Sequence, residues 1–285
     1  MKNAIELRCI CKSFGDFAIE DLNLTVPGGT ICGLVGENGA GKSTTIRLLM
    51  GALRPDGGSA AVLGVDVSSP EFIRVKEEVG VVLDEAYFPE TLNARQVERI
   101  MAKTYRRWEQ RVYEDYLDRF SLPENKPFKD FSRGMRMKLA IAAALSHHPR
   151  LLVLDEATSG LDPIVRDEVL EIFNEFTREE DHSILISSHI VSDLEKLCDY
   201  IAFLHRGRLL FCDEKDRLLE EYGVFVGTAE QADSLLPEAV LGRETRSYGG
   251  VRALVKRSLA PQTLALERPT VEEIILFIVK GADRR

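Results

Sequence analysis

The stretch that decides the fold is Gly36-Glu37-Asn38-Gly39-Ala40-Gly41-Lys42-Ser43-Thr44, whose first eight residues match the pattern GxxxxGK[ST] in full. It follows a short apolar run, Thr30–Val35, typical of a buried strand, and it opens a segment, Lys42–Met50, with helical character. Its backbone N–H groups can surround a phosphate, while Lys42 adds positive charge and the Ser43 hydroxyl can reach Mg²⁺. A glycine turn without a ligand is the alternative, but the flanking strand and helix favour nucleotide binding through this loop.

A second apolar run, Leu151–Leu154, ends in two acidic residues, Asp155 and Glu156. Open α/β sheets bind their ligands at the carboxyl ends of the strands, so both carboxylates are expected beside the phosphates. Asp155 is predicted to hold Mg²⁺, and Glu156 to orient and deprotonate a water that attacks the terminal phosphate. Paired surface carboxylates, or a helix cap, are the alternative interpretation.

The segments before and after the phosphate loop differ in pattern. Residues 6–26 alternate between apolar and polar positions and predict antiparallel strands with tight turns. Residues 89–149 contain long amphipathic stretches, including 94–120 and 135–146, and predict an inserted helical subdomain. The arginines around Trp108 are expected to form a solvated charged face rather than a nucleic-acid platform.

The second half of the chain alternates strand-like runs at 151–154, 184–187 and 200–204 with helical patterns, which predicts a parallel sheet covered by helices. Beyond residue 221 the pattern weakens to short strands and a last helix, Val271–Lys280, with a capping box at Thr270 and Glu273. The predicted fold is therefore α/β, of the P-loop NTPase class. It has an N-terminal antiparallel β subdomain, an inserted helical subdomain and a small α+β appendage, with domain boundaries at 1–221 and 222–285.

Composition excludes several classes of protein. The 285 residues carry a net charge of −9 and are 45% hydrophobic, which is typical of a globular chain and gives no general attraction to nucleic acid. No apolar run is long enough to span a bilayer, and the N-terminus does not resemble a signal peptide. The five cysteines form no CxxC pair and are expected to be reduced, mostly buried thiols of a cytoplasmic protein.

The order and spacing of these motifs resemble the nucleotide-binding subunit of an ABC transporter over residues 3–220. The resemblance implies ATP and Mg²⁺ as ligands. It places Phe14 where the family stacks an aromatic ring on adenine, and Phe14 is predicted to have this role; the alternatives are that the neighbouring Phe17 takes it, or that Phe14 is an ordinary core residue of a strand. It also identifies His189, which follows an apolar strand, as the switch histidine that contacts the γ-phosphate.

Two further segments have roles that only the resemblance implies. Phe131–Met135 (FSRGM) stands where the family has its signature LSGGQ, and implies that Ser132 and Gly134 approach the γ-phosphate held by the opposite subunit. Arg133 and Met135 depart from that pattern. Ser159–Asp162 (SGLD) matches the loop that crosses the dimer interface, although Asp162 before Pro163 is also an adequate helix N-cap.

Asp84 is the other departure from the family pattern. Most relatives have a glutamine there that touches Mg²⁺ and the attacking water, and a carboxylate is expected to ligate the metal as well. The segment Asp84–Arg99, together with the helical subdomain, is expected to be the docking groove for a membrane subunit.

The resemblance implies the ATP-hydrolysing subunit of a bacterial exporter. Two copies, or this chain and a similar ATPase subunit, would close head to tail over two ATP molecules and power a separate permease. Such a subunit is cytoplasmic, peripheral on the cytoplasmic face of the cell membrane, and touches the membrane only through the permease, with no nucleic acid as partner. The alternatives are an ABC-type ATPase that works away from membranes, and a P-loop kinase. The chain has neither the second cassette nor the coiled-coil insertion of the former, and its FSRGM and SGLD segments are foreign to the latter.

Overall fold

The computed structural model describes residues 2–84, 88–246 and 249–282. The chain divides into two compact units, the first made of Met1–Ile190 and Tyr200–Cys212, the second of Val191–Asp199 and Asp213–Arg285. The second unit thus begins nearer the N-terminus than residue 222 and includes one helix from within the nucleotide-binding region. Among the described residues, no helix is both long enough and apolar enough to cross a membrane.

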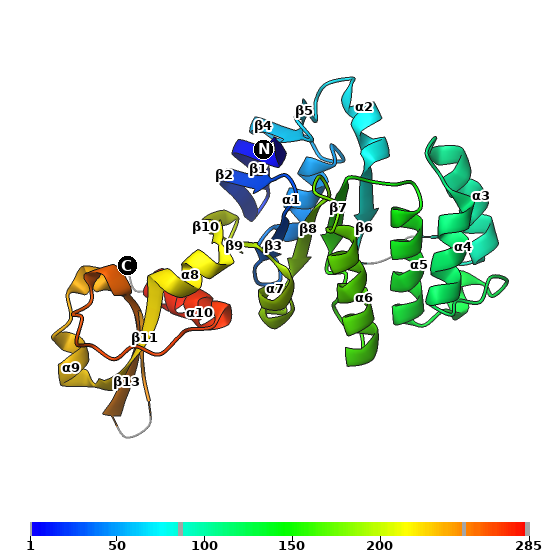
Figure 1. The fold of residues 1–285 in the computed structure, drawn as a ribbon. Coiled ribbons are helices and arrows are strands. Elements are labelled where there is room, and N and C mark those ends of the chain that lie inside the picture. Colours follow the sequence, from blue (N-terminus) through cyan, green and yellow to red (C-terminus); the bar gives the residue numbers. More distant parts are fainter. Residues whose placement is uncertain (1, 85–87, 247–248, 283–285) are drawn as a thin grey trace. The chain divides into compact units, whose positions relative to one another are not determined.

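A six-stranded sheet forms the centre of the first unit and confirms the predicted parallel arrangement (Figure 1). The pairs β3–β8, β3–β9, β6–β7 and β7–β8 are parallel, and every residue of β3, β7 and β8 is buried. Near-continuous apolar runs suit such strands because both faces of the sheet are covered. Across the sheet, the order is β10 (Arg208–Glu214), β9 (Tyr200–His205), β3 (Ile31–Val35), β8 (Ser183–Ser188), β7 (Leu151–Asp155) and β6 (Val79–Val82).

A four-stranded antiparallel sheet confirms the predicted N-terminal β subdomain. Its order is β2 (Phe17–Pro27), β1 (Asn3–Phe14), β4 (Gly57–Val62) and β5 (Val65–Asp66). Buried side chains of these strands share one core with helix α1 (Lys42–Leu49) and the central sheet. That shared core fixes the start of α1, and hence the phosphate loop, against the sheet. The short helix α2 (Phe72–Val75) and a 3₁₀ turn lead from this sheet to β6.

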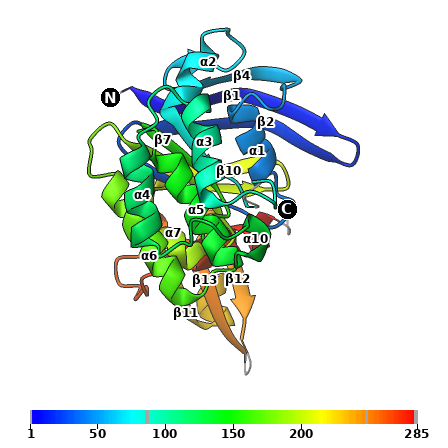
Figure 2. The same cartoon turned by 90° about the vertical axis from the view of Figure 1, so that its right-hand side faces the viewer.

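Helices α3 (Ala94–Thr104), α4 (Gln110–Arg119) and α5 (Arg133–Leu145) lie side by side and form the predicted helical subdomain (Figures 1 and 2). The amphipathic stretch 94–120 is two helices rather than one. The chain is extended at Tyr105, whose ring stacks on His147 with centroids 3.9 Å apart, and the Glu109 N–H donates to the Ser146 carbonyl at 2.8 Å. These contacts with the end of α5 interrupt the helix. Trp108 is half-buried in the subdomain, with its ring centroid 5.2 Å from that of Tyr113.

The second unit contains the predicted short strands and final helix. Its antiparallel sheet has the order β11 (Tyr222–Thr228), β13 (Gly250–Lys256) and β12 (Val240–Thr245), and its helices are α7 (Val191–Leu197), α8 (Lys215–Glu221), α9 (Ala229–Asp233) and α10 (Val271–Ala282). The capping box of α10 is confirmed, because the N–H groups of Thr270 and Glu273 each donate to the other residue's side chain. The Val271 N–H donates to Glu195 Oε2 at 3.3 Å and so ties α10 to α7.

The cysteines are free as expected, but the expectation that most are buried is wrong. Cys32 and Cys198 are buried, whereas Cys11 and Cys212 are half-buried and Cys9 is exposed. Cys9 has a φ of +49° within a register shift of β1, and such a bulge turns the side chain away from the alternation of the strand.

Candidate functional site

The phosphate loop connects β3 to α1, and sterics explain why glycine stands at three of its positions. Gly39 and Gly41 have φ values of +84° and +112°, in the region that favours glycine. A Cβ on Gly36 would lie 2.5 Å from the Leu204 carbonyl oxygen of the neighbouring strand β9. The Lys42 ammonium is buried and donates to the carbonyl oxygens of Gly36, at 2.7 Å, and Glu37. The structure therefore gathers the residues predicted to bind phosphate, Gly36 to Thr44, into one tight turn.

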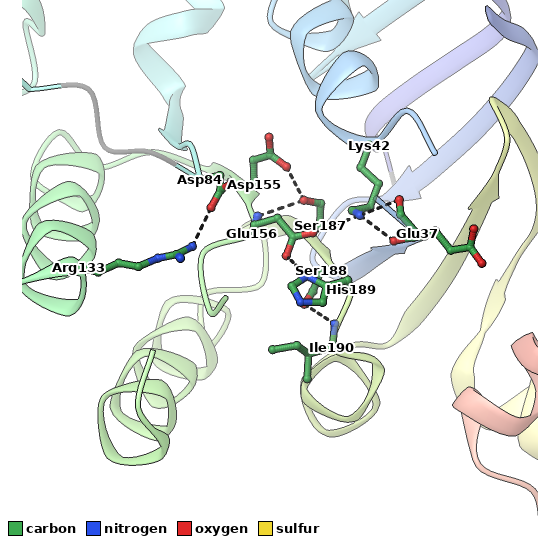
Figure 3. A network of polar contacts seen from close by, with 11 residues as sticks. Glu37, Lys42, Asp84, Arg133, Asp155, Glu156, Ser187, Ser188, His189 and Ile190 are labelled. Atoms are coloured by element: carbon green, nitrogen blue, oxygen red, sulfur yellow. Dashed lines mark hydrogen bonds and ion pairs between the residues drawn. The ribbon is translucent and has the colours of Figure 1, made fainter. Parts of the chain in front are cut away.

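Lys42, Glu156 and His189 meet at the carboxyl ends of β3, β7 and β8 (Figure 3). Glu156 Oε1 lies 3.2 Å from Lys42 Nζ, and Glu156 Oε2 lies 2.7 Å from His189 Nδ1. The contact with Lys42 is an ion pair without hydrogen-bond geometry, so the buried Oε1 atom accepts no hydrogen bond. This oxygen is therefore free to accept a hydrogen bond from a water molecule.

Glu156 also has an unusual backbone. Its φ of +52° lies in the left-handed region, which costs a residue other than glycine about 1–2 kcal/mol. The Glu156 N–H donates to the carbonyl of Ser187 on β8, and its carbonyl accepts from the Ser159 N–H, so the neighbouring chain holds the turn in place. Strain of this kind is common where a side chain must be aimed at a reaction centre.

Ser187 is a residue of the site that sequence reasoning missed. Its hydroxyl donates to Asp155 Oδ1 at 2.6 Å and accepts from the Glu156 N–H at 3.1 Å, and it is fully buried. One side chain therefore orients both predicted acidic residues. The signal was present in the sequence, because the apolar run of β8 ends in two serines, Ser187 and Ser188, directly before His189. Ser188 accepts from the Ile190 N–H and shapes the turn that carries His189.

The donor set suits Mg²⁺, although no group of three or more His, Cys, Asp or Glu side chains among the described residues is arranged as a metal cluster. Mg²⁺ in nucleotide sites takes one or two protein oxygen ligands and completes its shell with phosphate oxygens and waters. The Asp155 carboxylate at the end of β7 and the Ser43 hydroxyl on the first turn of α1 are oxygen groups of this kind, and their role as ligands stays a prediction. Asp84, the third predicted ligand, makes an ion pair with Arg133, and its role as a ligand also stays a prediction.

The signature segment, Phe131–Met135, lies at the start of α5. Ser132 is the N-cap, and its hydroxyl accepts from the Met135 N–H at 3.2 Å. Gly134 has ordinary helical geometry, and a Cβ placed on it would make ordinary van der Waals contacts with Val165 at 3.6 Å and Leu161 at 3.9 Å. Nothing within the described chain requires glycine here, and glycine costs a helix about 1 kcal/mol relative to alanine. The approach of Gly134 to nucleotide held by a partner subunit stays a prediction.

The crossing loop, Ser159–Asp162, leads into α6 (Pro163–Phe176). The Asp162 carboxylate accepts from the Val165 N–H at 3.1 Å, and Pro163 occupies the first turn, so its predicted role as N-cap is confirmed. Its role at a dimer interface stays a prediction.

Two of the departures from the family pattern lie in contact with each other. They are Arg133 in the signature segment and Asp84 at the glutamine position. Arg133 Nη2 lies 3.1 Å from Asp84 Oδ1, with both side chains about half exposed (Figure 3). The Arg133 guanidinium also lies against Gly160 of the crossing loop, where a Cβ would be 2.6 Å from Nη1. Residues 85–87 of the predicted docking segment Asp84–Arg99 lie outside the described residues.

The two aromatic candidates for adenine differ in their surroundings. Phe17 packs against the core, and its ring tip is the nearest atom that a Cβ on Gly41 would meet, at 3.0 Å. Phe14 is 42% exposed near the tip of the β1–β2 hairpin, with Lys12 Nζ 5.6 Å from its ring centroid. Adenine stacking by Phe14 stays a prediction, and the packing of Phe17 weakens the competing assignment.

Comparisons with known proteins agree with this geometry. Residues 19–159 match the family model described as "ABC transporter". The chain is 37% identical to the daunorubicin/doxorubicin resistance ATP-binding protein DrrA of Streptomyces peucetius, over 96% of this chain and 92% of that protein. It is 36% identical to the bacitracin transport ATP-binding protein BcrA of Bacillus licheniformis, over 74% of this chain and 69% of that protein. A solved ATP-binding subunit of an ABC transporter superposes with a TM-score of 0.69 at 27% identity, over 76% of this chain and 92% of that one.

Proposed function

The chain belongs to the ABC transporter family as a subunit that binds and hydrolyses ATP, and from this premise we propose how it works. Two copies close head to tail over two ATP molecules and power a separate transmembrane permease that exports its cargo. The observation that carries the proposal is the buried contact of Lys42, Glu156 and His189 beside the phosphate loop. The names of the relatives, which concern bacitracin transport and daunorubicin resistance, support export.

The residues of the site divide the chemistry among them. Lys42 binds the β- and γ-phosphates, which replace the Glu156 carboxylate as the partner of its ammonium group. Glu156 Oε1 then accepts a proton from the attacking water, while His189 holds Oε2 and contacts the γ-phosphate. Ser43 and Asp155 would hold Mg²⁺, with Asp84 as a further candidate ligand. When bound, the metal would neutralise charge on the phosphate oxygens.

The signature segment supplies the other half of each site in this proposal. Ser132 and Gly134 sit at the start of α5, where N–H groups and the helix dipole favour an anion. The absence of any steric need for glycine at position 134 within the described chain supports close approach of the partner's ATP. Asp162 would lie at the same interface, and Phe14 would stack on adenine.

The permease would dock on the helical subdomain and the segment Asp84–Arg99, which makes the subunit a cytoplasmic protein peripheral to the membrane. Its net charge of −9 argues against nucleic acid as partner. Residues 1–221 would act as the nucleotide-binding domain, and residues 222–285 as an accessory region.

The test is the molar mass of purified Glu156→Gln in solution, measured by light scattering with and without Mg-ATP. The substitution removes the base and should trap the closed dimer, so we expect an ATP-dependent doubling of mass. A monomer with ATP demonstrably bound would contradict the head-to-tail dimer. Wild-type protein, which can hydrolyse ATP and reopen, serves as the control and should show the doubling only transiently.

A further inference from the structure

Arg133 contacts two segments that are distant from it in sequence. Asp84, which follows β6, lies 49 residues before it, and Gly160 belongs to the loop before α6. Arg133 Nη2 donates to the Asp84 carboxylate, and the guanidinium occupies the space that a side chain on Gly160 would need, since a Cβ there would lie 2.6 Å from Nη1. One side chain of the signature segment thereby connects three functional segments of a single subunit.

We propose that Arg133 is a positioning residue for the ATPase reaction, which fixes Asp84 and the crossing loop relative to Ser132 of its own subunit. The inference rests on the proposed function and adds a residue that the nucleotide site itself does not include. Ser132 would face ATP bound by the partner, whereas Asp84 would face the subunit's own metal. Arg133 therefore links the two ATP sites of the dimer through one ion pair.

The geometry of the three partners supports this role. A guanidinium is planar and can pair with a carboxylate while its face lies on a backbone, which an ammonium cannot do. Gly160 has a φ of +65° and no side chain, and both features leave room for the guanidinium. A relative with glycine in place of Arg133 and glutamine in place of Asp84 would lack both halves of the pair, so the two departures are explained together.

The first measurement is the steady-state kinetics of Arg133→Ala, Asp84→Asn and the double variant. We expect Arg133→Ala to lower kcat about fivefold, the upper end for an exposed ion pair, with KM for ATP changed less than twofold. The double variant should be no slower than Asp84→Asn alone, because the interaction is already lost. Arg133→Lys, which keeps the charge but not the planar contact with Gly160, should recover only part of the loss.

The matched control is Arg243→Ala. Arg243 pairs with Asp233 in the second unit with similar exposure, 51% and 64% against 54% and 51%, and it belongs to none of the three segments. Its kcat should equal that of the wild type, and thermal unfolding should shift equally little in both variants.

Three outcomes overturn the inference. The first is that the losses of kcat in the two single variants add up in the double variant, and the second is that Arg133→Ala changes only KM. The third is a higher kcat in Arg133→Ala, which would mean that the ion pair slows the reaction. Failure of the proposed function looks different. It would appear as absent ATP hydrolysis in the wild type, or as a Glu156→Gln protein that stays monomeric with ATP bound, whatever the behaviour of Arg133→Ala.

Discussion

Lys42 and Glu156 form an ion pair whose side chains are 6% and 10% exposed, whereas Arg133 and Asp84 form one whose side chains are 54% and 51% exposed. Removing one partner of a buried pair leaves an uncompensated charge and costs about 3–5 kcal/mol, while an exposed pair contributes about 1 kcal/mol at most. The buried pair therefore persists until another anion, such as a phosphate, replaces the carboxylate. The exposed pair can be exchanged at little cost, which suits a connection between moving segments better than a chemical step.

Glu156→Gln, which changes the buried pair, should have the largest effect on the ATPase rate. The loss of the base should lower the ATPase rate at least about 100-fold, with ATP binding retained because glutamine keeps the shape of the side chain. Phosphate release and nucleotide binding, measured on the same preparation, check both statements. Glu168→Gln is the matched control, since Glu168 is a partly buried partner of Lys138 on α6. Undiminished activity in Glu156→Gln would refute the role of Glu156 as base.

Gly134→Ala separates folding from assembly. Alanine should stabilise the isolated subunit by about 0.5–1 kcal/mol, because it favours the helix and its Cβ meets nothing closer than 3.6 Å. In the Glu156→Gln background, the same Cβ should intrude on the partner's ATP and weaken ATP-dependent dimerisation at least about tenfold. Chemical denaturation and light scattering give the two numbers.

Changes of opposite sign in those two measurements are the expected result for Gly134→Ala. Unchanged dimerisation would mean that this face of α5 does not meet nucleotide.

Local motifs made much of this site predictable from the sequence. The phosphate loop, the acidic pair after β7 and the Asp162 cap each occupy a few consecutive residues, so their spacing along the chain fixes their geometry. The contact of Arg133 with Asp84 spans 49 residues and depends on how α5 packs near the end of β6, which no local pattern encodes. The break at Tyr105 is similar, because its cause is the stacked ring of His147, which is distant in sequence and follows the end of α5.

Ser187→Ala tests whether the buried cluster needs its serine. Removal of the hydroxyl leaves Asp155 Oδ1 without its donor and should lower kcat about fivefold to tenfold, since a hydrogen bond to a charged group contributes about 1.5–3 kcal/mol and water can replace part of it. Ser183→Ala is the control, because Ser183 is equally buried in β8 but only accepts from the Gly29 N–H at the opposite end of the strand. Both variants should lose similar stability.

Only Ser187→Ala should lose activity. Equal kcat in the two serine variants would reduce Ser187 to a structural role.

Ionic strength should produce the smallest effect and is the most direct probe of the difference in burial. Raising the salt concentration from about 0.1 M to about 1 M shortens the screening length from about 10 Å to about 3 Å, which weakens exposed pairs and leaves buried ones nearly unchanged. The ratio of wild-type kcat to Arg133→Ala kcat should therefore fall about twofold to threefold, whereas the ratio of wild-type to Glu156→Gln should stay constant. Because each ratio is taken at one salt concentration, general effects of salt on the enzyme cancel. A constant ratio for Arg133→Ala would mean that the contribution of Arg133 to kcat comes from its contact with Gly160 rather than from the charge on Asp84. The exposed pair would then act through packing, whereas the buried pair acts through charge.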